Sequence, residues 1–500
     1  MQITPKKDHR AELLMPAGSL SKLKTAILYG ADAVYAGTPD LSLRTQSSFT
    51  LEELLEGVRF AHSRGRRIYL TLNLFTHNKD IEKLPLFVET VRKVRPDGVI
   101  VSDQGVFHYL REHAPELDLH VSTQANACSW LTVESWRTQG AKLCVLAREV
   151  SFEELTEIRE KCTDIKLEAF VHGAMCMTYS GRCLLSNFMA ERGANQGACA
   201  NSCRWKYKVH MQLKDGTTKE LKLTEENLEL FDFLLEEEMR PGDMMPIEED
   251  DRGSYILNSK DLCIMPKLDD YLRIGVDSLK VEGRGKSVYY AALVARAYRM
   301  AIDDWYDDPK NWNADDYMAE LLTVPSRGYT FAFHEGRLTN HAHGYENTTT
   351  LADWEYAGLV VDVEEDALLI EAKNRLAAGD VLEFVAPVVN NKGSRDPVLL
   401  RIYEFEQVKT GKTVEVINPG HDTLFRLPFS VFDQEDIATL ARRIPANTLI
   451  RKEKSLTEEQ WDRLKLDRET RLIEAGKGSE EAYAERRENL QTSTESADST

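Results

Sequence analysis

Four of the eight cysteines in this chain lie within 28 residues, a concentration that points to a metal site. They are Cys176, Cys183, Cys199 and Cys203, with the spacing Cys-x6-Cys-x15-Cys-x3-Cys. Structural zinc sites usually have closely spaced cysteine pairs in both halves, and only the second half qualifies here. Iron–sulfur clusters accept more varied spacings, because their ligands come from a wider cage. The spacing favours iron–sulfur but leaves zinc, or no metal at all, open.

The expected compartment supports metal binding or catalysis over disulfide formation. The first ten residues, MQITPKKDHR, are polar and lack the apolar segment of a secretory signal. No run approaches the roughly 18 apolar residues that a membrane helix needs. We therefore expect a cytoplasmic protein without membrane contact, in which thiols stay reduced.

The net charge of −19 is unevenly distributed. Residues 1–210 carry 27 Lys and Arg against 24 Asp and Glu, a net charge of +3, and the remaining residues carry 36 against 58. An acidic total usually argues against nucleic-acid binding, because phosphate contacts need Lys and Arg. The cysteine-bearing half is mildly basic, so the argument does not exclude a local RNA-binding surface there.

The cysteines follow a repeated pattern of short apolar runs and amphipathic segments of helix length. Such alternation predicts parallel strands joined by helices, and eight units in about 300 residues favour a (β/α)8 barrel. The cysteines would then form a loop after the seventh strand. The expected strands are 12–18, 31–37, 66–73, 97–105, 119–127, 141–149, 165–173 and 277–284.

Polar side chains stand at or near the ends of these runs. In barrels of this kind the active site lies at the carboxyl ends of the strands, so these residues predict a functional rim. Each of them has an alternative role in capping a helix or completing a turn. Those taken as candidates for substrate contact from the rim alone are Asn73, Asp103 and Gln124.

The rest of the chain divides by composition. We expect the barrel domain to span residues 1–325 and to include an acidic insertion at about 209–255, either a lid or a solvated face. Residues 326–455 alternate apolar and polar side chains between Gly and Asn turns, which predicts a small antiparallel β-barrel-like domain. Residues 456–500 form a charged helical stretch and a tail expected to be disordered.

Several segments resemble peptidase family U32, the collagenase-like family. The stretch EAFVHGAMCMTYSGRC at 168–183 resembles the family signature, and ELLMPAGS, GADAVYAG, STQANA and DSLKVEGRGKS follow in family order. The resemblance covers roughly residues 10–450. NQGACANSCRWKY and RPGDMMPIEED are most similar to the branch of the family that hydroxylates tRNA.

The resemblance implies oxygen-independent hydroxylation of the wobble uridine at carbon 5, with prephenate as hydroxyl donor and the anticodon loop of tRNA as partner. It also implies a [4Fe–4S] cluster held by Cys176, Cys183, Cys199 and Cys203. Amino-acid side chains supply no electrophilic oxygen, so a redox-capable cofactor suits this chemistry better than zinc.

Prephenate is a dicarboxylate, and its binding needs Arg or Lys side chains. The candidates are Arg148, Lys280, Arg284 and, more weakly, Arg44. Salt bridges within the protein are the alternative role for each of them.

The acid–base candidates are His172, Glu168 and Glu282. Residues 168 and 172 of a regular strand share a face, so we expect Glu168 to orient the His172 imidazole from inside the barrel.

Three other functions stay open at this point. A ribosomal RNA cytidine hydroxylase belongs to the same family, and a collagenase-like protease fits the family name. No Ser/His/Asp arrangement in the sequence independently supports a protease. A non-catalytic RNA-binding protein with a structural cluster is the third alternative.

Overall fold

The computed structural model describes most of the chain. The described residues are 10–38, 49–73, 76–175, 260–336, 353–388, 395, 397–420, 423–432 and 437–454, with the backbone of short strands between 210 and 255. The four cysteines of the cluster, Arg44 and the tail from residue 455 lie outside the described residues.

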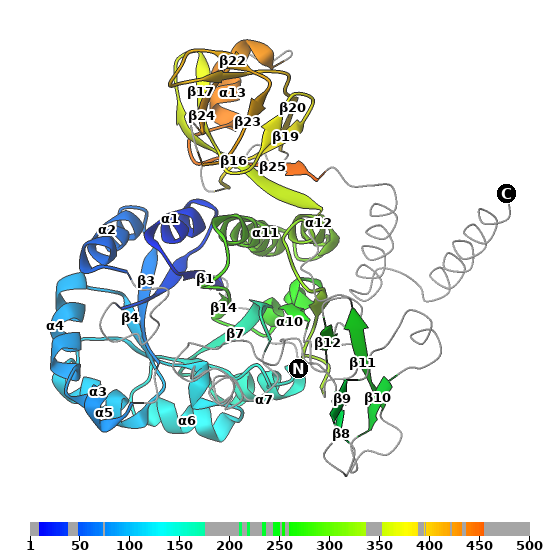
Figure 1. The fold of residues 1–500 in the computed structure, drawn as a ribbon. Coiled ribbons are helices and arrows are strands. Elements are labelled where there is room, and N and C mark those ends of the chain that lie inside the picture. Colours follow the sequence, from blue (N-terminus) through cyan, green and yellow to red (C-terminus); the bar gives the residue numbers. More distant parts are fainter. Residues whose placement is uncertain are drawn as a thin grey trace.

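A closed barrel of eight parallel strands forms the first part of the molecule (Figure 1). Its strands run in chain order, and β14 closes the ring by pairing in parallel with both β1 and β7. All eight strands expected from the sequence are present, so the TIM-like fold class is confirmed. They are β1 (Glu12–Ala17), β2 (Ala33–Gly37), β3 (Arg67–Leu72), β4 (Gly98–Val101), β5 (Leu119–Val121), β6 (Leu143–Val145), β7 (Lys166–Gly173) and β14 (Ser278–Val281).

Helices surround the barrel, and side-chain caps fix several of their starts. Ser151 caps α7 and forms a capping box with Glu154. Ser19 and Ser287 cap α1 and α11 in the same way. The helices are α1 (Leu20–Leu28), α2 (Leu51–His62), α3 (Asn78–Ile81), α4 (Leu84–Val94), α5 (Gln104–His113), α6 (Trp130–Thr138), α7 (Phe152–Lys161), α10 (Leu268–Arg273), α11 (Val288–Asp307) and α12 (Asp315–Leu321).

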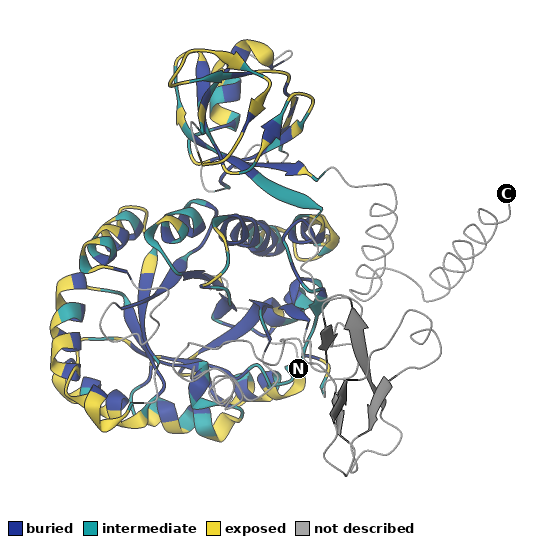
Figure 2. Cartoon of the chain, viewed as in Figure 1, coloured by how far each residue is buried: buried dark blue, intermediate teal, exposed yellow. Residues whose placement is uncertain are grey.

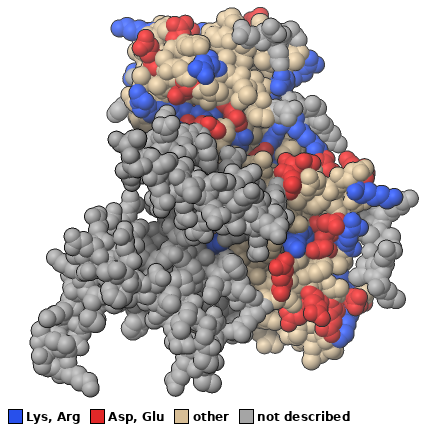
Figure 3. Space-filling view, turned by 90° about the vertical axis from the view of Figure 1, so that its right-hand side faces the viewer, with Lys and Arg blue, Asp and Glu red and all other residues tan. Residues whose placement is uncertain are grey.

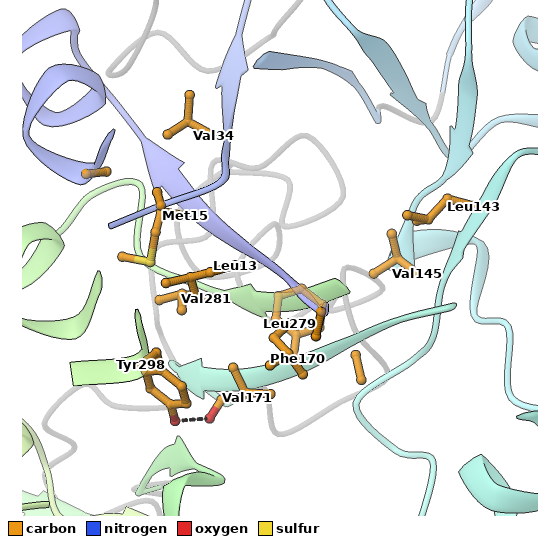
Figure 4. Packing of buried hydrophobic residues seen from close by; sticks show 14 of the residues in the cluster. Leu13, Met15, Val34, Leu143, Val145, Phe170, Val171, Leu279, Val281 and Tyr298 are labelled. Carbon is orange, nitrogen blue, oxygen red and sulfur yellow. Dashed lines mark hydrogen bonds between the residues drawn. The ribbon is translucent and has the colours of Figure 1, made fainter. Parts of the chain in front are cut away.

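Alternate residues of the strands divide the barrel core into two layers. The larger layer packs between strands and helices and includes Leu13, Met15, Leu279 and Val281 (Figure 4). A smaller cluster fills the barrel interior: Leu14, Ala33, Tyr35, Tyr69 and Ile100. The strands are therefore buried on both faces, as Figure 2 shows by their colour.

Two short strands beyond the eight expected barrel strands extend the barrel sheet. β13 (Asp261–Cys263) pairs antiparallel with β7, and β15 (Tyr329–Thr330) pairs with β13. The barrel sheet thus continues past residue 325, the boundary that the sequence predicts for the barrel domain. Within the acidic insertion, β8 (His210–Gln212) pairs with β9 (Thr218–Glu220). β10 (Phe233–Glu236), β11 (Met244–Asp250) and β12 (Gly253–Tyr255) form a second small antiparallel sheet.

The last part of the described chain is an antiparallel sheet with its own hydrophobic core. The predicted β-rich C-terminal architecture is therefore confirmed. Its strand order is β20-β19-β25-β16-β17-β24-β21-β22, and α13 (Ile437–Arg443) contributes Leu440 to the core. The strands are β16 (Trp354–Val363), β17 (Ala367–Ala372), β19 (Val381–Val385), β20 (Val398–Arg401), β21 (Phe405–Gln407), β22 (Thr413–Val414), β24 (Leu424–Pro428) and β25 (Leu449–Glu453); β18 (Leu376–Ala377) and β23 (Val416–Ile417) pair separately.

The C-terminal sheet packs beside α1, α11 and α12 of the barrel (Figure 1). The buried Tyr29 hydroxyl lies 2.7 Å from the Val385 carbonyl oxygen and accepts a hydrogen bond from the Leu449 N–H at 2.8 Å. Acidic and basic side chains are interspersed over the described part of the face in Figure 3. Among the described residues, no helix is both long and apolar enough to cross a membrane.

Candidate active site

Strand β14 carries polar side chains into the barrel at every second position. Ser278 and Lys280 hydrogen-bond to Glu168 of β7, whereas Leu279 and Val281 belong to the outer core layer. Glu282 and Arg284 follow directly after the strand ends, at the carboxyl end of the barrel. The alternation therefore brings three of the predicted site residues to one side of the barrel mouth.

Three predicted cations stack with two aromatic rings in this mouth. The Arg148 guanidinium lies 4.1 Å from the centre of the Phe170 ring, and the Lys280 ammonium lies 5.6 Å from the same centre. The ammonium is also 4.6 Å from the Tyr35 ring centre, and the Arg284 guanidinium is 5.4 Å from it. Cation–π attraction of this kind holds cations close together without a carboxylate between each pair.

Arg284 is the most exceptional of these cations. Its side chain reaches from the end of β14 to β3, where it donates a hydrogen bond to the Thr71 hydroxyl at 3.2 Å. The residue is only 4% exposed, its Nε has no hydrogen-bond partner, and no carboxylate among the described residues pairs with it. A buried charge without a counter-ion is costly, so this position suits an anionic ligand.

The other two cations have carboxylate partners. The Lys280 ammonium lies 2.6 Å from a Glu168 oxygen, and Arg148 lies 3.4 Å from a Glu282 oxygen. The Tyr35 hydroxyl donates to the Val281 carbonyl and lies 3.3 Å from the same Glu282 oxygen. These pairs fix the orientation of the side chains around the Arg284 guanidinium.

Below this layer the barrel interior contains a second carboxyl group, Glu12. Its carboxyl accepts from the Tyr69 hydroxyl at 2.9 Å and pairs with Arg67 at 2.5 Å. Burial raises the pKa of Glu12 to about 7, although Arg67 opposes this shift. Ser278 donates to Glu168 at 2.8 Å and lies 3.5 Å from Glu12, so it links the two carboxyl groups.

His172 does not meet Glu168, and the predicted contact between them is wrong. The register of β7 against β14 shifts between Phe170 and His172, so Val171 is an extra residue that turns His172 to the other face. The His172 ring packs against Tyr290, Tyr298 and Tyr329. Figure 4 shows Tyr298 donating to the Val171 carbonyl at this bulge.

Burial among these rings lowers the pKa of His172 to about 3. The imidazole is therefore neutral at working pH and makes a weak base. The Tyr298 hydroxyl lies 3.5 Å from its Nδ1. This environment favours a role in packing, and the acid–base assignment stays a prediction.

The remaining rim candidates differ in what they contact. Asp103 caps α5 by accepting from the Val106 N–H at 3.0 Å and from the Thr76 hydroxyl at 2.8 Å, which is the capping role that the sequence left open. Gln124 is buried in a short 3-10 turn, and Asn73 is half-buried after β3.

Sequence reasoning missed the side chains that organise the cations. Tyr35, Phe170 and Thr71 lie at inward positions of their strands, so strand alternation would have identified them once the inward face was known. Their neighbours on adjacent strands depend on the barrel register, which the sequence alone did not define.

The predicted cluster ligands lie outside the described residues. Cys176 comes three residues after Gly173, the last residue of β7. The other four cysteines are free thiols, and Cys144 is buried in the core. Among the described residues, no group of three or more His, Cys, Asp or Glu side chains is arranged to hold a metal.

Comparison with known proteins agrees with the resemblance. The family model "Peptidase family U32" matches residues 18–343. "tRNA hydroxylation protein P" of Escherichia coli K12 is 39% identical over 76% of this chain and 87% of its own length. "tRNA hydroxylation protein P1" of Bacillus subtilis 168 is 36% identical over 76% of this chain and 85% of its own length.

A more distant relative acts on ribosomal RNA by its name. "23S rRNA 5-hydroxycytidine C2501 synthase" of Escherichia coli K12 is 31% identical over 75% of this chain, but over only 53% of its own length. The match of the family model over most of the chain, together with these relatives, settles the family. The chain belongs to peptidase family U32.

Proposed function

We propose that this protein is a tRNA-modifying enzyme that hydroxylates carbon 5 of the wobble uridine to give 5-hydroxyuridine. Relatives named for tRNA hydroxylation at 36–39% identity support tRNA as the substrate. The reaction would take place in the cytoplasm and without molecular oxygen, with prephenate as the hydroxyl donor.

One structural observation supports an anionic donor. The Arg284 guanidinium is buried in the barrel mouth, bonds only to a neutral hydroxyl, and has no carboxylate partner among the described residues. Arg148 and Lys280 stand beside it across the Phe170 and Tyr35 rings. A carboxylate of the donor would supply the missing counter-ion, and a guanidinium can bind it through two parallel hydrogen bonds.

The four cysteines are the proposed ligands of a [4Fe–4S] cluster. Four soft thiolates are a complete donor set for such a cluster, and they follow the strand that carries Glu168 and Phe170. When bound, the cluster supplies electron-transfer chemistry that side chains lack. The side chains of the mouth then bind and orient the donor, and Glu282 is the proposed acid–base group because it lies beside Arg148 at the rim.

Mass spectrometry of tRNA nucleosides tests the proposal in cells. A strain lacking this chain would be grown without oxygen and complemented with the wild type or with Cys199→Ala. We expect 5-hydroxyuridine derivatives to disappear, to return with the wild type and to stay absent with Cys199→Ala.

Unchanged tRNA in all three strains would refute the proposal. Loss of 5-hydroxycytidine from ribosomal RNA in the same samples would instead support the second family activity, which the name of the distant relative suggests. Cleavage of casein or collagen by the purified protein would support a protease.

A further inference from the structure

A second cation without a carboxylate partner lies at the edge of the barrel mouth. Lys22 is in the first turn of α1, and its ammonium donates to the Arg284 carbonyl oxygen at 3.2 Å. Among the described residues, no Asp or Glu pairs with it. Burial lowers the pKa of Lys22, but its side chain is only partly buried and keeps access to solvent.

The surroundings of Lys22 add positive charge. α1 and α11 both begin at this corner, and neither has an acidic residue in its first turn. By contrast, α2 and α7 each carry two Glu side chains in theirs. The amino-terminal ends of helices carry partial positive charge, and at this corner no first-turn acidic side chain like those of α2 and α7 balances it; α4, α5 and α6 lack one as well.

The loop before α1 packs directly against the loop that carries Arg284. A Cβ added at Gly18 would collide with the Arg284 carbonyl oxygen, so only glycine allows this approach. The close contact places the ammonium of Lys22 beside the backbone of Arg284. The two cations therefore belong to one corner of the mouth but differ in depth, because Arg284 is 4% exposed and Lys22 is partly open to solvent.

Because Arg284 and Lys22 differ in depth, they suit different kinds of anion. An enzyme that modifies a base takes it out of the stack into a pocket, whereas the phosphate of that nucleotide remains at the pocket entrance. A buried guanidinium suits a small carboxylate that is fully enclosed, and a half-exposed ammonium suits a phosphodiester group. We propose that Lys22 binds a backbone phosphate of the RNA substrate, adjacent to the nucleotide whose base enters the barrel. This inference rests on the proposed function.

The hydrogen bond to the Arg284 carbonyl does not by itself require a charged group. A neutral amide would satisfy a carbonyl acceptor equally well, so a purely structural role predicts that Lys22→Gln behaves as the wild type does. A role in phosphate binding predicts that the charge itself matters. Lys22→Arg keeps the charge and should behave close to the wild type.

Salt-dependent binding of tRNA to the full-length holoprotein separates these roles. Lys24→Gln is the matched control, because Lys24 lies on the same helix but pairs with Glu56 at 2.5 Å. We expect Lys22→Gln to reduce the slope of log K against log salt by about 0.7 to 0.9, and to weaken binding by roughly threefold to tenfold at low salt. The control should keep the wild-type slope, and the donor KM of Lys22→Gln should be unchanged.

Two results would overturn the inference while leaving the proposed function intact. One is a Lys22→Gln slope equal to that of the wild type, in a wild type that binds and hydroxylates tRNA. The other is a raised donor KM with unchanged tRNA binding, which would assign Lys22 to the donor. If the wild type neither binds nor hydroxylates tRNA, the proposed function fails and the inference fails with it.

Discussion

At the residue scale, the buried Arg284 guanidinium defines the chemistry of the mouth. Arg284 is 4% exposed, and its guanidinium donates to a single acceptor, the Thr71 hydroxyl. Structural arginines elsewhere in the barrel are paired differently. Arg299, for example, lies 2.7 Å from both Asp32 and Asp303. An unpaired buried charge destabilises the folded protein, and a bound anionic ligand would neutralise it.

Replacing this charge should therefore affect activity and stability in opposite ways. We expect Arg284→Gln to lower kcat/KM for the donor by roughly 100-fold, because a buried charged hydrogen bond is lost. The midpoint of urea unfolding should stay the same or rise. A variant that unfolds more easily and binds the donor normally would show that Arg284 is structural.

Glu12 is the second residue whose state depends on burial. Its pKa is raised from 4.5 to about 7, so the folded protein holds a proton on Glu12 that the unfolded chain has released in this interval. Because the folded state binds more protons, the free energy of unfolding should fall as pH rises from 4.5 to 7. The contribution of Glu12 to the free energy of unfolding should be constant below pH 4.5 and above pH 7.

Glu12→Gln should remove this dependence on pH. The Glu12 contribution amounts to roughly 3 kcal/mol across the interval, as an upper bound. Urea unfolding of the wild type and the variant at pH 4.5, 6 and 8 would measure the difference, with Glu89→Gln, an exposed carboxylate on α4, as the control. Parallel curves for wild type and Glu12→Gln would contradict the raised pKa.

At the element scale, the irregular end of β7 shapes the mouth. The extra residue Val171 turns His172 outward, and Gly173 then takes a φ of 112°. A Cβ at Gly173 would collide with the carbonyl of Glu282 on the neighbouring strand end. The bulge and the glycine together bring the end of β7 against Glu282 at the mouth.

Gly173→Ala should disturb the site through this contact. We expect a loss of about 2–4 kcal/mol in the free energy of unfolding and at least a tenfold fall in activity, because Glu282 must move. Gly275→Ala is the control: Gly275 also has a positive φ, 74°, but has no atom within 4 Å of the added Cβ. It should lose only about 1 kcal/mol and keep its activity. Equal effects of the two changes would contradict the role of the contact.

The sequence could predict the strands but not this irregularity. Each strand is an apolar run of its own, so all eight were visible from local pattern. A bulge depends on the register between β7 and β14, whose residues are about 110 positions apart, as in the Ser278–Glu168 pair. For that reason the contact between Glu168 and His172 was predicted wrongly, whereas the grouping of Arg148, Lys280 and Arg284 was available from their positions at strand ends.

At the scale of the whole molecule, one buried tyrosine joins the barrel to the C-terminal sheet. Tyr29 is the residue that follows α1. Its hydroxyl contacts the carbonyls of Val385 and Asn447 and the N–H of Leu449. The sequence predicts an antiparallel C-terminal part, but no local pattern around Tyr29 indicates this long-range contact.

Tyr29→Phe should weaken the packing of the two parts. Three buried backbone groups would lose their partner, which costs roughly 1–3 kcal/mol. Comparing the midpoints of urea unfolding of the wild type and the variant measures the loss. Tyr403→Phe changes a side chain in the same C-terminal part that is 67% exposed and should have no effect. A Tyr29→Phe protein as stable as the wild type would contradict the importance of this contact.

Labelled prephenate would show whether an anionic donor in the barrel mouth supplies the hydroxyl group to a tRNA uridine. The purified holoenzyme would be incubated without oxygen with tRNA and prephenate carrying 18O in its ring hydroxyl. We predict 5-hydroxyuridine that contains 18O, and its formation should fall sharply in Arg284→Gln. Unmodified tRNA, or 5-hydroxyuridine without the label, would contradict it.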